Sequence, residues 1–333
     1  MYDATFPLAD FRTQSGITLD LQLAYRVHGE PNAAGSNIVL LPTYFSGRAS
    51  DNDYLIGEHK ALDPGRYCIV VPSLFGNGVS SSPSNAPAPW SRSRFPRLTY
   101  FDNVAAQHAL LTQVFGANQL QAVIGFSMGA MQAWQWAAQY PSMVQRVVSI
   151  CGSARTAEHN QLFLDGLVAA LTADGSFREG EYDTPPIQGL EAFSVVYAGW
   201  FASQRFFADQ RYREAGINDL AGLVGLAKQI FMSHDANDLL AMAATWRAGD
   251  PGANDVYAGS FEKAMQAIGA RALVMPCDTD LYFRVSDNEA EVAMLKNATL
   301  APIRSDFGHL AGGGFDSAAL TFITARIHAF LAE

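Results

Sequence analysis

One stretch near the middle of the chain reads Leu120-Gln121-Ala122-Val123-Ile124-Gly125-Phe126-Ser127-Met128-Gly129-Ala130-Met131. Its apolar first half is typical of a buried strand, and a helix is predicted to follow over about Ala130–Gln139. A Gly-x-Ser-x-Gly turn between a strand and a helix is the pattern of a nucleophile elbow, in which the central residue is strained. Gly125 and Gly129 supply the room that the turn needs, and the Ser127 hydroxyl is expected to project above the sheet edge.

Ser127 is therefore the candidate nucleophile of an acyl-transfer reaction. The helix after it directs its first free N–H groups at the place where negative charge develops in such a reaction. The alternative is a Gly-rich turn in which the serine only caps the helix. We expect the nucleophile, because both the strand and the helix lie where the motif requires them.

The composition limits the classes of protein to be considered. The chain has 333 residues, of which 49% are apolar and 16% charged, so a large core can be buried in one or two domains. A net charge of −10 argues against nucleic acid or an anionic membrane surface as the main partner. Nowhere do about 18 apolar residues run together, so no membrane span is predicted.

Cysteine usage and the N-terminus bear on the compartment. Cys68, Cys151 and Cys277 are widely spaced, each in or beside an apolar run, and no C-x-x-C occurs. A disulfide framework or zinc cluster is therefore not expected, and a reducing cytosol fits best. The first residues lack the basic and apolar regions of a signal peptide, so we expect a cytoplasmic protein.

Short apolar runs alternate with helical segments on both sides of the elbow. Such runs are typical of strands buried on both faces, and the alternation predicts an α/β fold with a mostly parallel, doubly wound sheet. Residues 6–27 alternate apolar and polar around a Gly-Ile turn, as in an antiparallel hairpin at a sheet edge. The buried strands are predicted at 37–41, 67–72, 144–152, 271–276 and 298–303.

The helices around this sheet are predicted from apolar spacing and capping signals. One is expected at 101–115, another near 54–62, and a terminal helix at 316–331. A further helix is expected at 286–296, with Ser286 as its N-cap and Glu289 completing a capping box.

The strand pattern stops between about residues 153 and 269, where almost every segment is helical in character. This segment is too long for one sheet crossover. We therefore predict a core domain of residues 1–152 and 270–333, with an inserted helical lid at 153–269. The aromatic side chains of the lid either pack against the core or another subunit, or line an apolar substrate pocket. Its helical pieces are predicted at 157–173, 190–215, 219–233, 235–247 and 261–268.

A serine hydroxyl needs a general base within reach and a third group that orients the base. In this architecture the acid and then the histidine follow the serine, on loops at the carboxyl ends of strands. Of the seven histidines, only His309 follows a late strand, with Gly308 before it and the Gly-rich loop 312–314 after it. His309 is therefore the predicted general base.

The acid is expected in the loop after the strand at 271–276, which contains Asp278 and Asp280. We select Asp280 because it lies deeper in the loop, whereas Asp278 could cap the turn. Asp306 is the second alternative because it is close to His309 in sequence. No further carboxylate or histidine cluster lies beside this pair, so neither a metal nor another cofactor is expected.

Two backbone N–H groups should form the oxyanion hole of such a site. One belongs to Met128, the residue after the nucleophile. The other must come from the loop after the strand at 37–41, where Tyr44 is the predicted donor and Phe45 the alternative. Loss of one such donor typically costs ~3 kcal/mol of transition-state stabilisation.

Several motifs together resemble the homoserine O-acetyltransferase-like family of α/β-hydrolases, and the resemblance covers nearly the whole chain. It implies an α/β-hydrolase fold, a triad of Ser127, Asp280 and His309, a helical lid, and a homodimer formed through the lid helices. The residues that carry it are Thr99–Gln107 with Leu110-Leu111, Gly125–Met131, His234–Asp238, Asp278–Tyr282 and Gly308-His309.

The chain departs from the homoserine acetyltransferases at two positions where the resemblance implies charge. In those enzymes an Asp directly after the catalytic histidine is thought to hold the substrate amino group, and here that residue is Leu310. They also carry a Tyr-Arg-Ser run whose Arg binds the substrate carboxylate, and the comparable stretch here is Gly199–Ser203. A zwitterionic amino acid would then be buried with unpaired charges.

The sequence therefore predicts a serine esterase that hydrolyses small, uncharged acyl esters, including acetate esters, through a covalent acyl-enzyme. An O-acetyltransferase that moves an acyl group from acyl-CoA to an alcohol is the alternative. The triad does not distinguish the two, because the difference lies in how well the lid excludes water. A non-catalytic ligand-binding protein with an intact triad is a second alternative.

Overall fold

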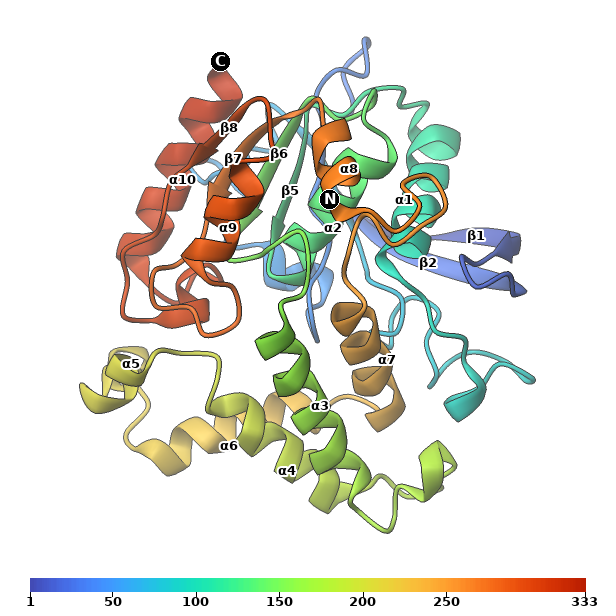
Figure 1. Cartoon of the computed structure of the whole chain (residues 1–333), viewed down its shortest axis with the longest axis vertical. Helices are drawn as coiled ribbons and strands as arrows, with labels where there is room; N and C mark the ends of the chain where they lie inside the picture. Colours follow the sequence, from blue (N-terminus) through green and yellow to red (C-terminus); the bar gives the residue numbers. More distant parts are fainter.

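The computed structural model describes all 333 residues, with a sheet and its flanking helices in the upper half of Figure 1 and a layer of helices below. Eight strands form one sheet in the order β1-β2-β4-β3-β5-β6-β7-β8. The pairs β1–β2 and β2–β4 are antiparallel, and the other pairs are parallel. The mostly parallel α/β sheet and its edge hairpin are therefore confirmed. The strands are β1 (Tyr2–Arg12), β2 (Thr18–His28), β3 (Ile38–Leu40), β4 (Cys68–Pro72), β5 (Ala122–Phe126), β6 (Arg146–Ile150), β7 (Arg271–Met275) and β8 (Ala298–Leu300).

The helices divide between the sheet and the lower layer. In Figure 1, α1, α2, α8, α9 and α10 accompany the sheet, whereas α3 to α7 make up the layer below it. No helix has the length and apolar character needed to span a bilayer. The α-helices are α1 (Tyr100–Phe115), α2 (Met128–Gln139), α3 (Glu158–Thr172), α4 (Ile187–Ala198), α5 (Gln204–Ala208), α6 (Leu220–Phe231), α7 (Ala236–Arg247), α8 (Phe261–Ala267), α9 (Val285–Val292) and α10 (Ser317–Ala332).

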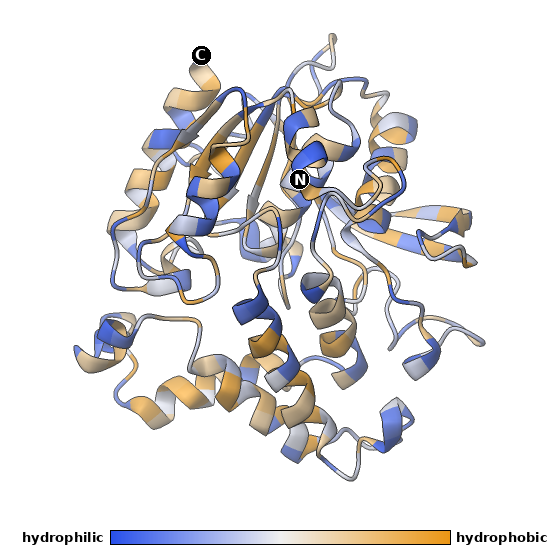
Figure 2. Ribbon diagram, in the orientation of Figure 1, coloured by the Kyte–Doolittle hydropathy of each residue, from blue (hydrophilic) through white to orange (hydrophobic).

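Alternate side chains of each central strand enter two different apolar clusters, one on each face of the sheet. In β3, Ile38 and Leu40 join the cluster that contains side chains of α1, α2 and α8, whereas Val39 joins the cluster that contains side chains of α10. Figure 2 shows the central strands as hydrophobic along their length, while the surrounding helices mix both colours. Because each fully buried aliphatic side chain contributes about 1.5–3 kcal/mol, these two layers hold the carboxyl ends of the strands in fixed positions.

A third apolar cluster occupies the lower layer. It joins side chains of α3, α4, α6 and α7 to Met128 and Met131 of α2, and so it ties the layer to the elbow. Helix α8 lies instead on the sheet, where Phe261 and Ala264 belong to the same cluster as α2. The insertion predicted for residues 153–269 therefore contains a final helix that packs with the core.

The helix predicted near residues 54–62 does not form. This segment is a tight loop in which the Gly57 N–H donates to the Leu62 carbonyl and the Leu62 N–H to the Leu55 carbonyl. Gly57 and His59 both have positive φ, at 151° and 66°, and neither value is compatible with a right-handed helix.

Two other helix predictions are wrong in detail. The segment 190–215 is broken after α4, and a second helix starts when the Ser203 hydroxyl accepts the N–H of Phe206. The helix predicted from an N-cap at Ser286 begins at Val285 instead, so the expected capping box is absent. In both places a helix forms, but its ends differ from those predicted; at α5 the Ser203 side chain also contacts the distant Asp306 carbonyl.

Candidate active site

Ser127 lies at a strained turn between β5 and α2. Its backbone has φ 57° and ψ −126°, which a side-chain-bearing residue rarely adopts, and α2 begins at Met128, earlier than predicted. A Cβ on Gly125 would lie 2.0 Å from the Gly129 carbonyl carbon, and one on Gly129 would lie 2.7 Å from the Pro42 oxygen. The serine side chain makes no capping hydrogen bond, so the helix-cap alternative is excluded.

A continuous hydrogen-bond chain joins this serine to a carboxylate through an imidazole. His309 Nε2 lies 2.9 Å from Ser127 Oγ, and His309 Nδ1 lies 2.7 Å from Asp280 Oδ2. Ser127, His309 and Asp280 are only 2%, 5% and 6% exposed. The structure thus brings together the nucleophile, base and acid that the sequence selects, at distances that allow proton transfer.

The loop after β7 orients the Asp280 carboxylate. Asp280 Oδ1 accepts the N–H groups of Tyr282 at 2.8 Å and Phe283 at 3.3 Å, which leaves Oδ2 free for the imidazole. Because an ionised carboxylate only accepts, Nδ1 carries the proton and the Nε2 lone pair faces the Ser127 hydroxyl.

Two aromatic rings pack against the His309 imidazole and fix its orientation. The Phe126 ring stacks on His309 with centroids 4.7 Å apart, and the Tyr282 ring meets it edge-on at 4.8 Å. Burial raises the pKa of Tyr282 well above its ordinary value, so its phenol remains neutral. The imidazole has little freedom to rotate away from the serine.

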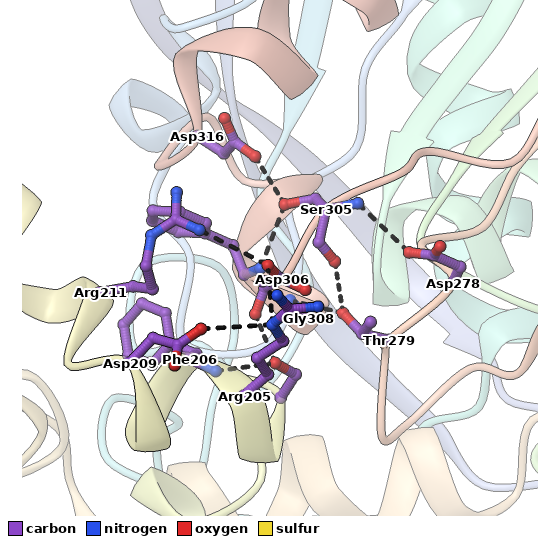
Figure 3. A network of polar contacts seen from close by, with 12 residues as sticks. Arg205, Phe206, Asp209, Arg211, Asp278, Thr279, Ser305, Asp306, Gly308 and Asp316 are labelled. Atoms are coloured by element: carbon purple, nitrogen blue, oxygen red, sulfur yellow. Dashed lines mark hydrogen bonds and ion pairs between the residues drawn. The ribbon is translucent and has the colours of Figure 1, made fainter.

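The two alternative acids make other contacts. Asp278 Oδ1 accepts the Ser305 N–H at 3.2 Å, and its other oxygen pairs with Arg304. Asp306 pairs with Arg205 at 3.6 Å and with Arg211 at 3.5 Å, as Figure 3 shows. Asp280, by contrast, reaches the imidazole.

The predicted oxyanion donors lie beside the elbow. Met128 is the first residue of α2, so its N–H has no partner within the helix. Tyr44 and Phe45 follow β3, and the N–H of neither donates to a backbone acceptor. The Tyr44 ring contacts Phe126 edge-on at 5.0 Å, whereas the Phe45 ring stacks on Tyr197 of α4 at 5.6 Å. Both amides are therefore available, and the choice between them stays open.

A buried chain of amides that sequence reasoning missed fixes this donor loop against α2. The Gln132 side-chain amide donates to the Thr43 carbonyl at 2.8 Å, and Gln107 donates to Gln132 at 2.7 Å. Trp136 of α2 completes the chain by donating to Gln107 at 2.7 Å. Gln107 and Gln132 are both fully buried, but nothing in the sequence near either residue shows that the two side chains pair.

The chain is similar to known α/β-hydrolases over nearly its whole length. A family model described as the alpha/beta hydrolase fold matches residues 36–175. An ethyl acetate hydrolase of Pseudomonas veronii is 39% identical over 317 residues, covering 93% of this chain and 90% of that protein. A homoserine O-acetyltransferase of Trichormus variabilis is 30% identical over 310 residues, covering 88% and 84%.

The chain belongs to the homoserine O-acetyltransferase-like family of α/β-hydrolases. The resemblance stated from the sequence is thereby confirmed. Within this family, the solved structure of the acetyl esterase MekB superposes with a TM-score of 0.97 at 36% identity, covering 100% of this chain and 97% of that one.

Apolar groups occupy both positions at which the amino-acid-acetylating members of the family are expected to carry charge. Leu310 is half-buried and packs against the apolar cluster on the α10 face of the sheet. In the stretch Gly199–Ser203, Trp200 lies parallel to Tyr282 with centroids 6.4 Å apart. Tyr282 in turn covers His309, so the groups next to the imidazole on this side are aromatic.

Proposed function

We propose that this protein is a serine-dependent hydrolase of small, uncharged acyl esters, including acetate esters, with Ser127, His309 and Asp280 as its catalytic residues. The observation that carries the proposal is the unbroken hydrogen-bond chain from the Asp280 carboxylate through His309 to the Ser127 hydroxyl. The similarity to an ethyl acetate hydrolase, at 39% identity over nearly the whole chain, supports the substrate class.

The reaction follows from the roles of these groups. Ser127 Oγ attacks the ester carbonyl while His309 Nε2 takes its proton, and Asp280 stabilises the imidazolium. The N–H groups of Met128 and of Tyr44 or Phe45 hold the oxyanion. The tetrahedral intermediate then expels the alcohol, which receives the proton from His309. Water then attacks the acyl-Ser127 ester while His309 takes its proton; the second tetrahedral intermediate releases the acid, and His309 returns the proton to Ser127 Oγ.

Hydrolysis and acyl transfer differ only in the acceptor that attacks the acyl-enzyme. An O-acetyltransferase is the second candidate function, because a homoserine O-acetyltransferase is 30% identical to this chain over most of its length. Leu310 and the aromatic side chains at Trp200 and Tyr282 favour hydrolysis of neutral esters, since a zwitterionic acceptor would lack charged partners there.

The remaining features of the proposal concern the surroundings of the site. We propose that α3 to α7, which lie in the segment 153–269 predicted as a lid, cover the triad and that a homodimer forms through them. The three cysteines are free and buried, which supports the cytoplasmic location predicted from the sequence.

A panel of reactions tests the proposed function. We expect turnover of p-nitrophenyl acetate and ethyl acetate that does not depend on homoserine, and no acetyl-CoA consumption when homoserine is added. Rapid CoA release that requires homoserine would establish the transferase instead. Binding of acetate esters without any turnover would establish a ligand-binding protein.

A further inference from the structure

The loop directly before His309, residues 305–308, is held from two sides by two hydroxyl groups. Two consecutive carbonyls within this loop accept hydrogen bonds. Ser305 O accepts from the Thr279 hydroxyl at 2.6 Å, and Asp306 O accepts from the Ser203 hydroxyl. Figure 3 shows residues 305–308 between the loop that contains Asp278 and Thr279 and the start of α5, which contains Arg205 and Phe206.

Thr279 spans the whole loop with one oxygen. Its Oγ1 donates to Ser305 O and accepts the Gly308 N–H at 3.2 Å, so it fixes the beginning of the loop and the residue directly before His309. Thr279 is also the residue directly before Asp280. The acid and the base of the triad are therefore joined through one side chain as well as through their own hydrogen bond.

The outer side of the loop is fixed by the segment 201–206. The Leu310 N–H donates to the Phe201 carbonyl at 3.2 Å. Gly308 has φ 60°, and a Cβ there would lie 2.7 Å from the Ser203 nitrogen, so only glycine allows this close contact. The Ser203 oxygen also accepts the Phe206 N–H at 3.0 Å, and this bond starts α5.

We propose that Thr279 and Ser203 are positioning residues for His309, acting through the carbonyls of Ser305 and Asp306. This inference rests on the proposed function, since it assigns both residues to the geometry of its general base. Neither hydroxyl touches the reacting atoms. Their effect is to hold the imidazole at hydrogen-bonding distance from Ser127, where a misplacement of about 1 Å can cost ~100-fold in rate.

The principal test replaces Thr279 by valine, which keeps the shape and removes the hydroxyl, and by serine, which keeps the hydroxyl. We expect Thr279→Val to lower kcat about 10- to 100-fold with KM changed less than about threefold, and Thr279→Ser to stay within about threefold of wild type. Ser203→Ala should also lower kcat without a comparable change in KM.

Thr245→Val is the matched control. Its hydroxyl donates to the Leu98 carbonyl at 2.7 Å, which is also a long-range bond from a threonine to a loop carbonyl, but it holds no part of the histidine loop. We expect this variant to lose thermal stability as Thr279→Val does, with kcat close to wild type. If Thr279→Val and Ser203→Ala both lost stability while kcat stayed within threefold, the two hydroxyls would be structural only and the proposal would be overturned.

A spectroscopic readout separates this inference from the proposed function. The proton shared by His309 Nδ1 and Asp280 should give a downfield NMR signal in the wild type, in Thr279→Ser and in Thr245→Val. We expect that signal to broaden or disappear in Thr279→Val and to weaken in Ser203→Ala. If the protein hydrolyses no ester, the proposed function is refuted, but the NMR signal still tests the inference. If the signal is unchanged in all variants, the inference alone is refuted. If Thr279→Val does not fold, Ser203→Ala decides both readouts.

Discussion

Ser127 is held in a backbone conformation that costs about 1–3 kcal/mol in an ordinary residue. The strain persists because the elbow is packed from several directions. A Cβ on Gly152 would lie 2.4 Å from the Ala130 side chain, and the added Cβ atoms on Gly125 and Gly129 would also lie closer than 3 Å to the backbone of Gly129 and Pro42. The close packing around these glycines thus fixes the direction in which the Ser127 hydroxyl points.

The elbow should therefore not accept a methyl group. Gly125→Ala would place Cβ 2.0 Å from the Gly129 carbonyl carbon, and we expect it to lower the free energy of unfolding by about 3 kcal/mol or more, or to prevent folding. Urea unfolding measures the change. Gly166→Ala in α3 is the control, since nothing lies within 4 Å of its added Cβ, and it should raise stability by up to about 1 kcal/mol. Equal stability of both variants would contradict the packing described for the turn.

The orientation of the imidazole depends on a charged acceptor at Asp280. Asp280→Asn would present an amide to His309 Nδ1 and favour the wrong tautomer, so we expect kcat for p-nitrophenyl acetate to fall about 10³- to 10⁴-fold with the fold intact. Asp278→Asn should lower kcat less than about tenfold, because Asp278 binds the Ser305 N–H and Arg304 and not the imidazole. The result would contradict the assignment if the two variants had similar rates or if Asp278→Asn were the more damaging.

At the scale of the elements, α7 is attached to the long loop after β4 by a buried carboxyl group. Asp238 is 2% exposed and accepts both the N–H of Ser84 at 3.0 Å and its hydroxyl at 2.6 Å. Burial raises the pKa of Asp238 to about 7. The group is thus protonated in the folded protein over a pH range in which the unfolded chain has already lost the proton.

This shift makes stability depend on pH in a defined direction. Because the pKa is higher in the folded state, the contribution of Asp238 is complete below the ordinary aspartate pKa of 3.8 and is lost as the pH rises through about 7. Relative to Asp238→Asn, the wild type should lose roughly 1 kcal/mol of unfolding free energy per pH unit between pH 5 and 7. Urea unfolding at each pH measures the difference, in which the contributions of the other buried acids with raised pKa values, Asp102 and Glu291, cancel. Parallel stability curves would contradict the buried-proton explanation.

The sequence predicted the elements whose environment is uniform along their length. Strands such as β4 and β5 are buried on both faces and therefore appear as continuous apolar runs, and the elbow has a pattern of its own. The helix expected near 54–62 failed because the left-handed conformation of His59 has no composition signal. The break before α5 was missed because a contact between Ser203 and the distant Asp306 determines it.

Within the site, too, residues in a predictable local context could be predicted from the sequence, and residues that depend on distant partners could not. Ser127, His309 and Asp280 could be predicted as candidates because each lies at a predictable point in the order of strands and loops, and the structure brings all three within hydrogen-bonding distance. Gln132 and Thr279 were not found, because their partners lie 89 and 26 residues away and the pairing leaves no local pattern. Supporting contacts of this kind depend on the assembled fold.

At the scale of the whole molecule, the helices below the sheet carry exposed apolar side chains on their outer surface. Leu220, Leu226 and Ile230 of α6 are 55%, 40% and 42% exposed, and Val195 of α4 is 49% exposed. Isolated exposed apolar residues are common, but with Ile187 of α4, which is 45% exposed, there are five on two helices that pack against each other, and this favours a contact surface. They lie on the part of the chain through which we propose that the homodimer forms.

Charges on this surface should separate the proposed dimer. We expect Leu226→Glu combined with Ile230→Glu to give about half the wild-type mass in light scattering after size-exclusion chromatography, because two buried carboxylates oppose association. Val256→Glu is the control, since Val256 is 76% exposed and lies on a loop outside these helices. A wild-type monomer, or a double variant that remains a dimer, would refute the proposed interface.

Labelling with a fluorophosphonate, followed by mass mapping of the modified peptide, examines the activated serine most directly. The reagent should modify Ser127 alone, Ser127→Ala should not be labelled, and His309→Ala should be labelled at least about 100-fold more slowly. Modification of a different residue, or equal labelling rates for His309→Ala and the wild type, would contradict a serine activated by that histidine.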